Sequence, residues 1–121
     1  MGMFLRRGNV LADVSVSLSG EFDASYAYAA IGGVTYTSDT TLVVPARTQV
    51  TVHVTSTIWD LLSGITNESD GTVTVNGRKV TVTDREYVYM AKLPTTIVFS
   101  VVTTGEGMTR TSTRSCTITT S

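Results

Sequence analysis

The 121-residue sequence has little of what reactive centres are usually built from. It contains one cysteine, Cys116, and one histidine, His53, so it can form neither an intrachain disulfide nor a zinc site of cysteine and histidine ligands. A Ser–His–Asp or Cys–His arrangement would have to include His53 or Cys116, and both lie within strand-like runs. We therefore expect no enzyme activity, no metal and no cofactor. A small hydrolase that uses His53 is the least favoured of three functional hypotheses.

Charge and long apolar runs are also scarce. Charged residues make up 16% of the chain and the formal net charge is −1, whereas a nucleic-acid-binding protein usually has a basic excess. The short basic pairs Arg6-Arg7 and Arg78-Lys79 are predicted to be solvated surface or to protect strand edges from pairing. No run approaches the ~20 apolar residues of a membrane span, and the first residues lack the pattern of a signal peptide. We expect no nucleic acid, no membrane and no export.

The rest of the sequence is rich in β-branched Val and Thr, interrupted by only two prolines and ten glycines. In the segment GTVTVNGRKVTV, residues 71–82, apolar and polar residues alternate on both sides of Asn76-Gly77. This dipeptide predicts a two-residue type I′ hairpin turn that places Val75 opposite Arg78. Lys79 then faces solvent, and Arg78 lies at the rim. The valines predicted to face the core are Val73, Val75, Val80 and Val82.

Other segments follow the same pattern. Gly32-Gly33 predicts a second hairpin, with Ile31 opposite Val34 and Ala29 opposite Tyr36. The clean alternation in residues 48–56 places three valines on one face of a strand: Val50, Val52 and Val54. The Thr-rich final segment, residues 109–121, is predicted to be an edge strand, in which Cys116 is a small apolar filler.

Two segments share one plan, a hairpin, a short turn, a strand, a proline-containing turn and a further strand. They cover residues 30–54 and 74–101. Between them, residues 56–71 are the one stretch that reads as non-strand, with Trp59 as a helical turn or a packed cap. We predict an all-β fold with two quasi-repeated halves, an Ig-like antiparallel β-sandwich or alternatively a partly open β-barrel. Residues 1–12 would form an N-terminal arm and residues 13–121 a single domain.

Aromatic side chains are the best candidates for binding, because exposed rings stack on sugars and anchor protein interfaces. Tyr87 and Tyr89 share one face of their strand, and Arg78-Lys79 adds a basic pair. The interpretation we favour for most of these rings is nevertheless that they fill the core and the ends of the fold. The candidate binding residues are Tyr26, Tyr28, Trp59, Tyr87, Tyr89, Arg78 and Lys79. Two acidic clusters, Glu68 to Asp70 and Asp84 to Glu86, lack the spacing of a calcium-binding loop.

Several short motifs resemble small Ig-like β proteins from the structural gene clusters of bacteriophages and prophages of Gram-positive bacteria. The resemblance covers residues 26–121, with two departures: Arg47 stands where glycine is expected, and Gly32 where asparagine is usual. The matching motifs are Tyr36-Thr37-Ser38, Val44-Pro45, Thr48-Gln49-Val50, Gly71 to Gly77 and Thr117 to Ser121.

The resemblance implies a non-enzymatic virion-associated structural or accessory protein, made in the cytoplasm of the bacterial host. It would decorate the capsid or form part of the tail or neck, through contacts with itself or with other virion proteins. The alternative hypothesis is a carbohydrate-binding module that attaches the particle to glycans of the host surface through Tyr26, Tyr28 or Trp59.

Overall fold

A computed structural model of the chain describes residues 13–60, 62–91, 94–106 and 111–121. These residues form eleven β-strands, which confirms the all-β prediction. The strands are β1 (Val14–Gly20), β2 (Ala27–Ile31), β3 (Val34–Tyr36), β4 (Thr40–Val44), β5 (Thr48–Asp60), β6 (Gly64–Asp70), β7 (Thr72–Val75), β8 (Arg78–Val80), β9 (Glu86–Ala91), β10 (Thr95–Glu106) and β11 (Thr111–Thr120). The described residues include no helix able to span a membrane. The predicted N-terminal arm, residues 1–12, lies outside them.

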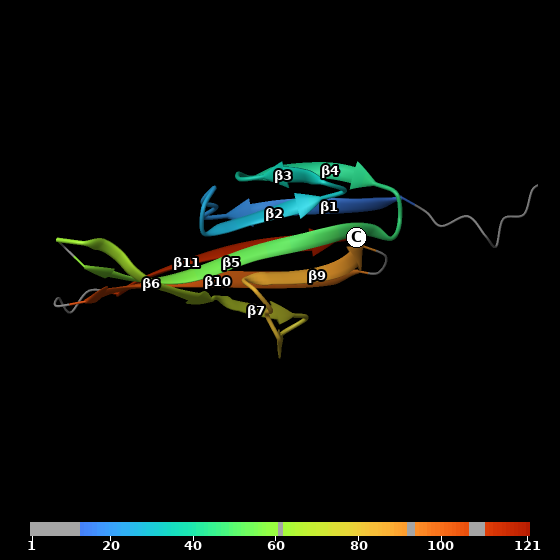
Figure 1. Ribbon diagram of the computed structural model, residues 1–121. Helices are drawn as coiled ribbons and strands as arrows, with labels where there is room; N and C mark the ends of the chain where they lie inside the picture. The colour runs from blue at the N-terminus through green and yellow to red at the C-terminus, as the bar shows by residue number, and fades with distance from the viewer. Residues whose placement is uncertain (1–12, 61, 92–93, 107–110) are drawn as a thin grey trace, which may run out of the picture.

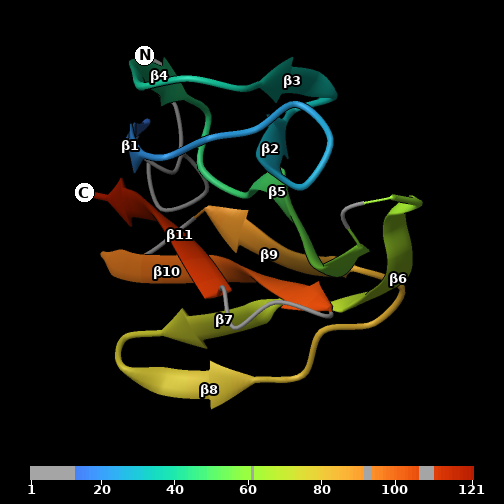
Figure 2. The same ribbon diagram turned by 90° about the vertical axis from the view of Figure 1, so that its left-hand side faces the viewer.

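The strands form one continuous sheet that curls into a nearly closed barrel (Figures 1 and 2). Its main path is β3-β2-β5-β10-β11-β1-β4, while β6 and β9 branch from β5 and β7-β8 branches from β10. The two ends of the path, β3 and β4, lie on the same side of the molecule (Figure 2). This arrangement matches the partly open barrel, whereas the Ig-like sandwich is not confirmed.

Strand β5 holds the sheet together because its two halves pair with different neighbours. Residues 50–54 pair with β2 and residues 48–53 pair with β9, and both neighbours are antiparallel to β5. Residues 57–60 pair in parallel with residues 103–106 of β10, and residues 55–60 pair with β6. At the change of partners, Val54 donates its N–H to the carbonyl of Arg85 (2.9 Å) and accepts the N–H of Gly71 (3.0 Å). The backbone groups of Val54 therefore stay paired where the sheet divides.

The core lies inside the barrel and is made of alternating side chains from β1, β2, β5, β10 and β11. Val50, Val52 and Val54 are completely buried, as the sequence pattern predicts. Phe99 of β10 is the largest fully buried side chain, and its ring meets Phe22 edge-on at 6.0 Å. Cys116 is buried on β11, in the position predicted for a small filler.

Both predicted hairpins have the predicted register. Val73 pairs with Val80 and Val75 with Arg78, and the φ angles of Asn76 and Gly77 are 51° and 83°, as a type I′ turn requires. The burial prediction for this hairpin is only partly right, because Val73 alone is fully buried and the other three valines are partly exposed. The reason is that β8 is a short edge strand paired only with β7 in the described chain.

In the Gly32-Gly33 hairpin, Ile31 pairs with Val34 and Ala29 with Tyr36, and both glycines have positive φ. Arg47 also has a positive φ, 71°, in the turn after Pro45. That conformation suits glycine, the residue expected at this position from the resemblance, and Arg47 adopts it nonetheless.

Two predictions about local structure are wrong. The final strand is not an edge, since β11 lies between β10 and β1 and pairs with both. Its inward side chains, Cys116, Ile118 and Thr120, are all buried, so alternating threonines here mark the outer face of an inner strand. The predicted non-strand stretch is instead the β5–β6 hairpin, and Trp59 lies within β5.

Candidate ligand-binding pocket

The β5–β6 hairpin and the paired ends of β10 and β11 project beyond the barrel, as Figure 1 shows at its left. We term this part, residues 55–60, 62–70, 101–106 and 111–114, the extension. A pocket of about 200 Å³ lies where the extension leaves the barrel. Its lining residues are Asp23, Tyr26, Thr57, Trp59, Ile65, Val101, Thr103 and Arg114.

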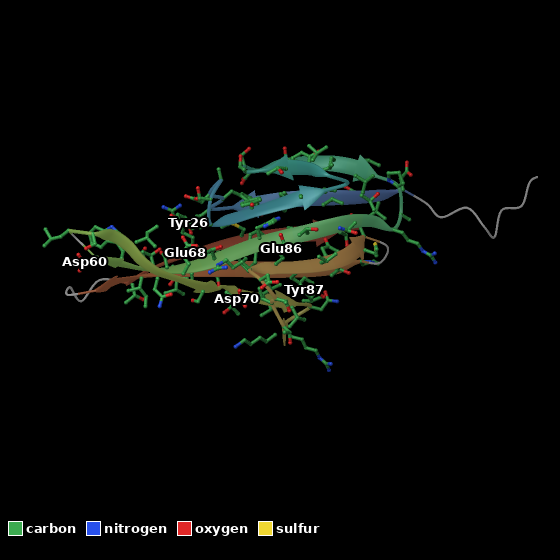
Figure 3. All side chains as sticks on the ribbon, viewed as in Figure 1. Tyr26, Asp60, Glu68, Asp70, Glu86 and Tyr87 are labelled. Atoms are coloured by element: carbon green, nitrogen blue, oxygen red, sulfur yellow. The ribbon has the colours of Figure 1, made fainter. Side chains whose placement is uncertain are left out.

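Tyr26, labelled in Figure 3, is held at one side of the pocket by the turn before β2. The Oδ1 atom of Asp23 accepts the N–H groups of Ser25 (2.8 Å) and Tyr26 (3.1 Å), an arrangement that Asp favours in turns. The carbonyl of Tyr26 in turn accepts the N–H of Thr55 from β5 at 2.8 Å. The position of the tyrosine is therefore fixed by backbone hydrogen bonds on both sides.

Trp59 contributes a second aromatic side chain from β5. It pairs with Ile65 on β6 at an irregularity in the register, and with Gly105 on β10. Gly105 has no side chain to cover the indole from the paired position on β10. The two rings line the pocket without stacking on each other, since the ring contacts among the described residues involve other pairs.

The polar side of the pocket combines an ion pair with a pair of hydroxyls. Arg114 Nη1 lies 3.0 Å from Asp23 Oδ2, and the two side chains are 50% and 28% exposed. Thr57 donates its hydroxyl to that of Thr103 at 3.2 Å. The opposite charges of Asp23 and Arg114 cancel, so the lining has no net formal charge. Hydrogen-bond donors and acceptors are nevertheless present along it.

The structure separates the remaining predicted binding residues into three other places. Tyr28 lies on the outer face of the sheet and stacks on His53, with ring centroids 4.3 Å apart and planes at 11°. The His53 Nδ1 atom is 3.3 Å from Glu86 Oε2. These three residues form one row across β2, β5 and β9. His53 is thus a partly exposed residue in the middle of a sheet, as the sequence predicts.

Tyr87 and Tyr89 share one face of β9, as predicted, with ring centroids 6.4 Å apart. Both are partly buried and pack against the core. Burial, with a smaller contribution from Tyr87, raises the pKa of Tyr89 to about 12. Among the described residues its hydroxyl has no hydrogen-bond partner. These rings therefore serve packing.

Arg78 and Lys79 lie exposed on the edge strand β8. Lys79 borders a second, more open hollow of about 430 Å³, whose lining comes from residues 70–72 and 79–82. The basic pair does not contribute to the pocket of Tyr26 and Trp59. The position of β8 fits the prediction that this pair protects an edge.

The two acidic clusters are occupied by contacts within the protein. Asp70 Oδ1 accepts the N–H of Arg85 at 2.8 Å, and the carbonyl of Glu68 accepts Arg85 Nη2 at 3.3 Å (Figure 3 labels both acidic residues). Arg85 and Asp84 both have positive φ, so these bonds hold a strained turn in place. The described residues contain no group of three or more His, Cys, Asp or Glu that could hold a metal.

Sequence reasoning identified Tyr26 and Trp59 but missed the polar half of the pocket. Asp23 and Arg114 are 91 positions apart, and Thr57 and Thr103 are 46 apart. Each of these residues stands among many similar ones in the sequence. The pairing of β5 with β10 places Thr57 beside Thr103. The pairing of β1 with β11, which ends at Gly20 and Cys116, brings the segment that contains Asp23 toward Arg114.

Comparison with known proteins gives no match, either to a protein-family model, to a curated protein or to a solved structure.

Proposed function

We propose that the chain is a non-enzymatic, virion-associated structural or accessory protein that acts through protein–protein contacts. A decoration protein of the capsid and a module of the tail or neck are the two forms of this proposal. The motif resemblance to phage structural proteins supports it from the sequence. The extension is the observation on which the proposal chiefly rests.

The extension presents apolar side chains to solvent far from the core. Leu62 at the end of the β5–β6 hairpin is 93% exposed, and Ile58 and Ile65 on the two strands of the hairpin are also exposed. Exposed apolar groups gathered on a projection are typical of contact surfaces. They are costly for an isolated domain because they remain in water. A partner that covered them would recover that free energy.

The extension also offers a strand edge. Strand β6 pairs only with β5 within the described residues, so its other edge presents unpaired backbone groups. Such an edge can accept a strand from another chain, in which main-chain hydrogen bonds supply affinity and side chains supply specificity. Arg85 already binds this edge at the Glu68 carbonyl, so the part nearer the tip of the hairpin is the part open to a partner. Apolar exposure and an open strand edge thus occur together on the same hairpin.

The test is the association state of the purified full chain, measured by size-exclusion chromatography with light scattering over a wide concentration range. We expect self-association that Leu62→Ser weakens. Val43→Ser is the matched control, since Val43 is 65% exposed on β4, outside the extension. A strict monomer at high concentration, or equal effects of the two substitutions, would count against the extension as the contact surface.

A second candidate function is carbohydrate binding, in which the protein attaches its particle to glycans of the host surface. The observation in its favour is that the fold brings Tyr26 and Trp59 to one pocket together with charged and hydroxyl side chains. Aromatic rings beside hydrogen-bonding groups are suited to sugars. Co-sedimentation of the full chain with insoluble bacterial cell-wall polysaccharide would test it, and absence of the protein from the pellet would contradict it.

A further inference from the structure

The size of the pocket limits what can enter it. Its volume of about 200 Å³ is smaller than the roughly 300–1,000 Å³ of sites for drug-sized ligands. An occupant of this size is a single small ring or one side group of a larger molecule, rather than several linked residues of a chain.

The walls of the pocket suit a ring with an apolar face. Tyr26 and Trp59 both line it, and Ile65 and Val101 add aliphatic surface. The faces of aromatic rings pack well against flat apolar groups, which include the C–H face of a sugar ring. Neither aromatic side chain is fully buried, so both keep surface for a ligand to cover.

The polar groups suit a ligand that has several hydroxyls and no charge. Asp23 can accept a hydrogen bond from a ligand hydroxyl, and the half-exposed Arg114 has further N–H groups to donate. Thr103 accepts the hydroxyl hydrogen of Thr57, so its own hydrogen is available to an acceptor. The charges of Asp23 and Arg114 cancel each other, so the pocket carries no net charge that would attract an anionic or a cationic ligand.

We propose that this pocket binds one neutral sugar ring, at the end or on a side branch of a glycan. The hydroxyls would bond to Asp23, Arg114 and Thr103, and the C–H face would pack on Tyr26 or Trp59. This inference rests on the second proposed function and narrows it to one site and one ligand class. It does not depend on the proposal that Leu62 forms part of a protein–protein contact surface.

The chain contains a single tryptophan, so its fluorescence reports directly on this pocket. The full chain is titrated with methyl glycosides of neutral hexoses and of N-acetylhexosamines, and the emission of Trp59 is followed. We expect a saturable change with at least one of these sugars. Calorimetry of the same titration measures the affinity independently of the fluorophore.

Variants on one strand provide a matched control. Thr103→Val removes the hydroxyl at almost constant volume, and we expect about five- to tenfold weaker binding, the effect of one lost hydrogen bond. Thr104→Val makes the same change at the adjacent residue, which is exposed and does not line the pocket. It should leave binding unchanged. Circular dichroism confirms that both variants keep the fold.

The possible results distinguish the proposal that this pocket binds a sugar from the broader proposal that the protein binds carbohydrate. A saturable change that Thr103→Val weakens and Thr104→Val does not would support the inference. If no methyl glycoside binds while the protein still sediments with polysaccharide, the pocket is not the site but carbohydrate binding stands. If neither is observed, both proposals fail. Equal effects of the two valine variants would place the sugar elsewhere and overturn the inference.

Discussion

The two halves of strand β5, residues 48–54 and 55–60, have different surroundings and different roles in the fold. Residues 48–54 bury every second side chain in the barrel, between β2 and β9. Residues 55–60 run into the extension, where Thr57 and Trp59 line the pocket and Ile58 is exposed. The first half is stabilised by close packing, whereas the second depends on backbone pairing and a few contacts.

This difference has a physical consequence for stability. A region with few buried apolar contacts opens more easily than the core, because little transfer free energy opposes its opening. Binding surfaces tend to be drawn from such regions. We therefore expect the extension to open locally while the barrel remains folded, and the contact and sugar sites proposed above both lie in or beside it.

The largest predicted difference between the two regions is in thiol reactivity. Cys116 is 1% exposed, and burial raises its pKa to about 11, so near neutral pH it is a protonated thiol without access to reagents. In the variant Leu62→Cys the new thiol is exposed on the extension. We expect it to react at least about 10³-fold faster than Cys116, because the buried thiol must wait for global opening.

The measurement is the time course of modification by an aromatic disulfide reagent, followed by absorbance. The variant contains both thiols, so each serves as the reference for the other in a single sample. Two well-separated phases are expected, each corresponding to one thiol. A single fast phase would mean that the barrel around Cys116 opens as readily as the extension.

The next largest effect is on the core. Phe99→Ala removes the largest fully buried side chain and should lower the free energy of unfolding by about 3–5 kcal/mol. Val43→Ala, at an exposed site on β4, should change it by less than about 0.5 kcal/mol. Urea denaturation followed by circular dichroism measures both. Similar losses for the two variants would contradict the assignment of the core to the inside of the barrel.

Alanine substitutions at Gly71 and Gly64 test whether the extension opens independently of the barrel. A Cβ on Gly71 would lie 2.7 Å from the carbonyl oxygen of Ser100 and 2.8 Å from the Cβ of Val54, at the point where β5 changes partners. Gly71→Ala should therefore destabilise the whole fold by about 1–3 kcal/mol. Gly64 has open space but a φ of +79°, so Gly64→Ala costs about 1 kcal/mol of backbone strain in the extension alone.

We expect Gly71→Ala to lower the urea midpoint. Gly64→Ala should leave it unchanged and instead speed hydrogen exchange in β6 and the end of β5. If Gly64→Ala shifts the midpoint as much as Gly71→Ala does, the extension and the barrel unfold together and the comparison between them fails.

Local chemistry explains which parts of the fold the sequence could predict. The hairpin at Asn76-Gly77 and its register depend on residues that are adjacent in the chain, and the alternation of Val50, Val52 and Val54 directly reports one buried face. By contrast, the place of β11 between β10 and β1 depends on pairing over long distances. Alternating threonines fit an edge strand and an inner strand equally well.

The pocket lined by Tyr26 and Trp59 was harder to predict from the sequence than the hairpins were. Short apolar runs such as Ile58-Trp59 have no period that separates a strand from a helical turn, and this stretch proved to be strand. Arg114 becomes recognisable as a site residue only when Asp23 is seen beside it.

The smallest predicted effect is a pH dependence confined to the tip of the extension. Asp60 accepts the N–H groups of Leu62 (2.8 Å) and Ser63 (3.1 Å) through Oδ1. The bond from Leu62, and then that from Ser63, lowers the pKa of the Asp60 carboxyl below its usual 3.8. Since the folded form has the lower pKa, these bonds stabilise the turn above the unfolded pKa. Their contribution is lost as the pH falls through the folded value.

Acidification below a pH of 3.8 should therefore loosen the hydrogen bonds of Asp60 with Leu62 and Ser63 before it affects the barrel. The measurement is the amide chemical shifts of Leu62 and Ser63 as a function of pH, beside those of core residues. Asp60→Asn is the matched control, because its side-chain oxygen still accepts hydrogen bonds but does not titrate, so these two amides should become independent of pH. Core amides that shift before those of the turn would show that the barrel, and not the extension, is the more acid-sensitive region.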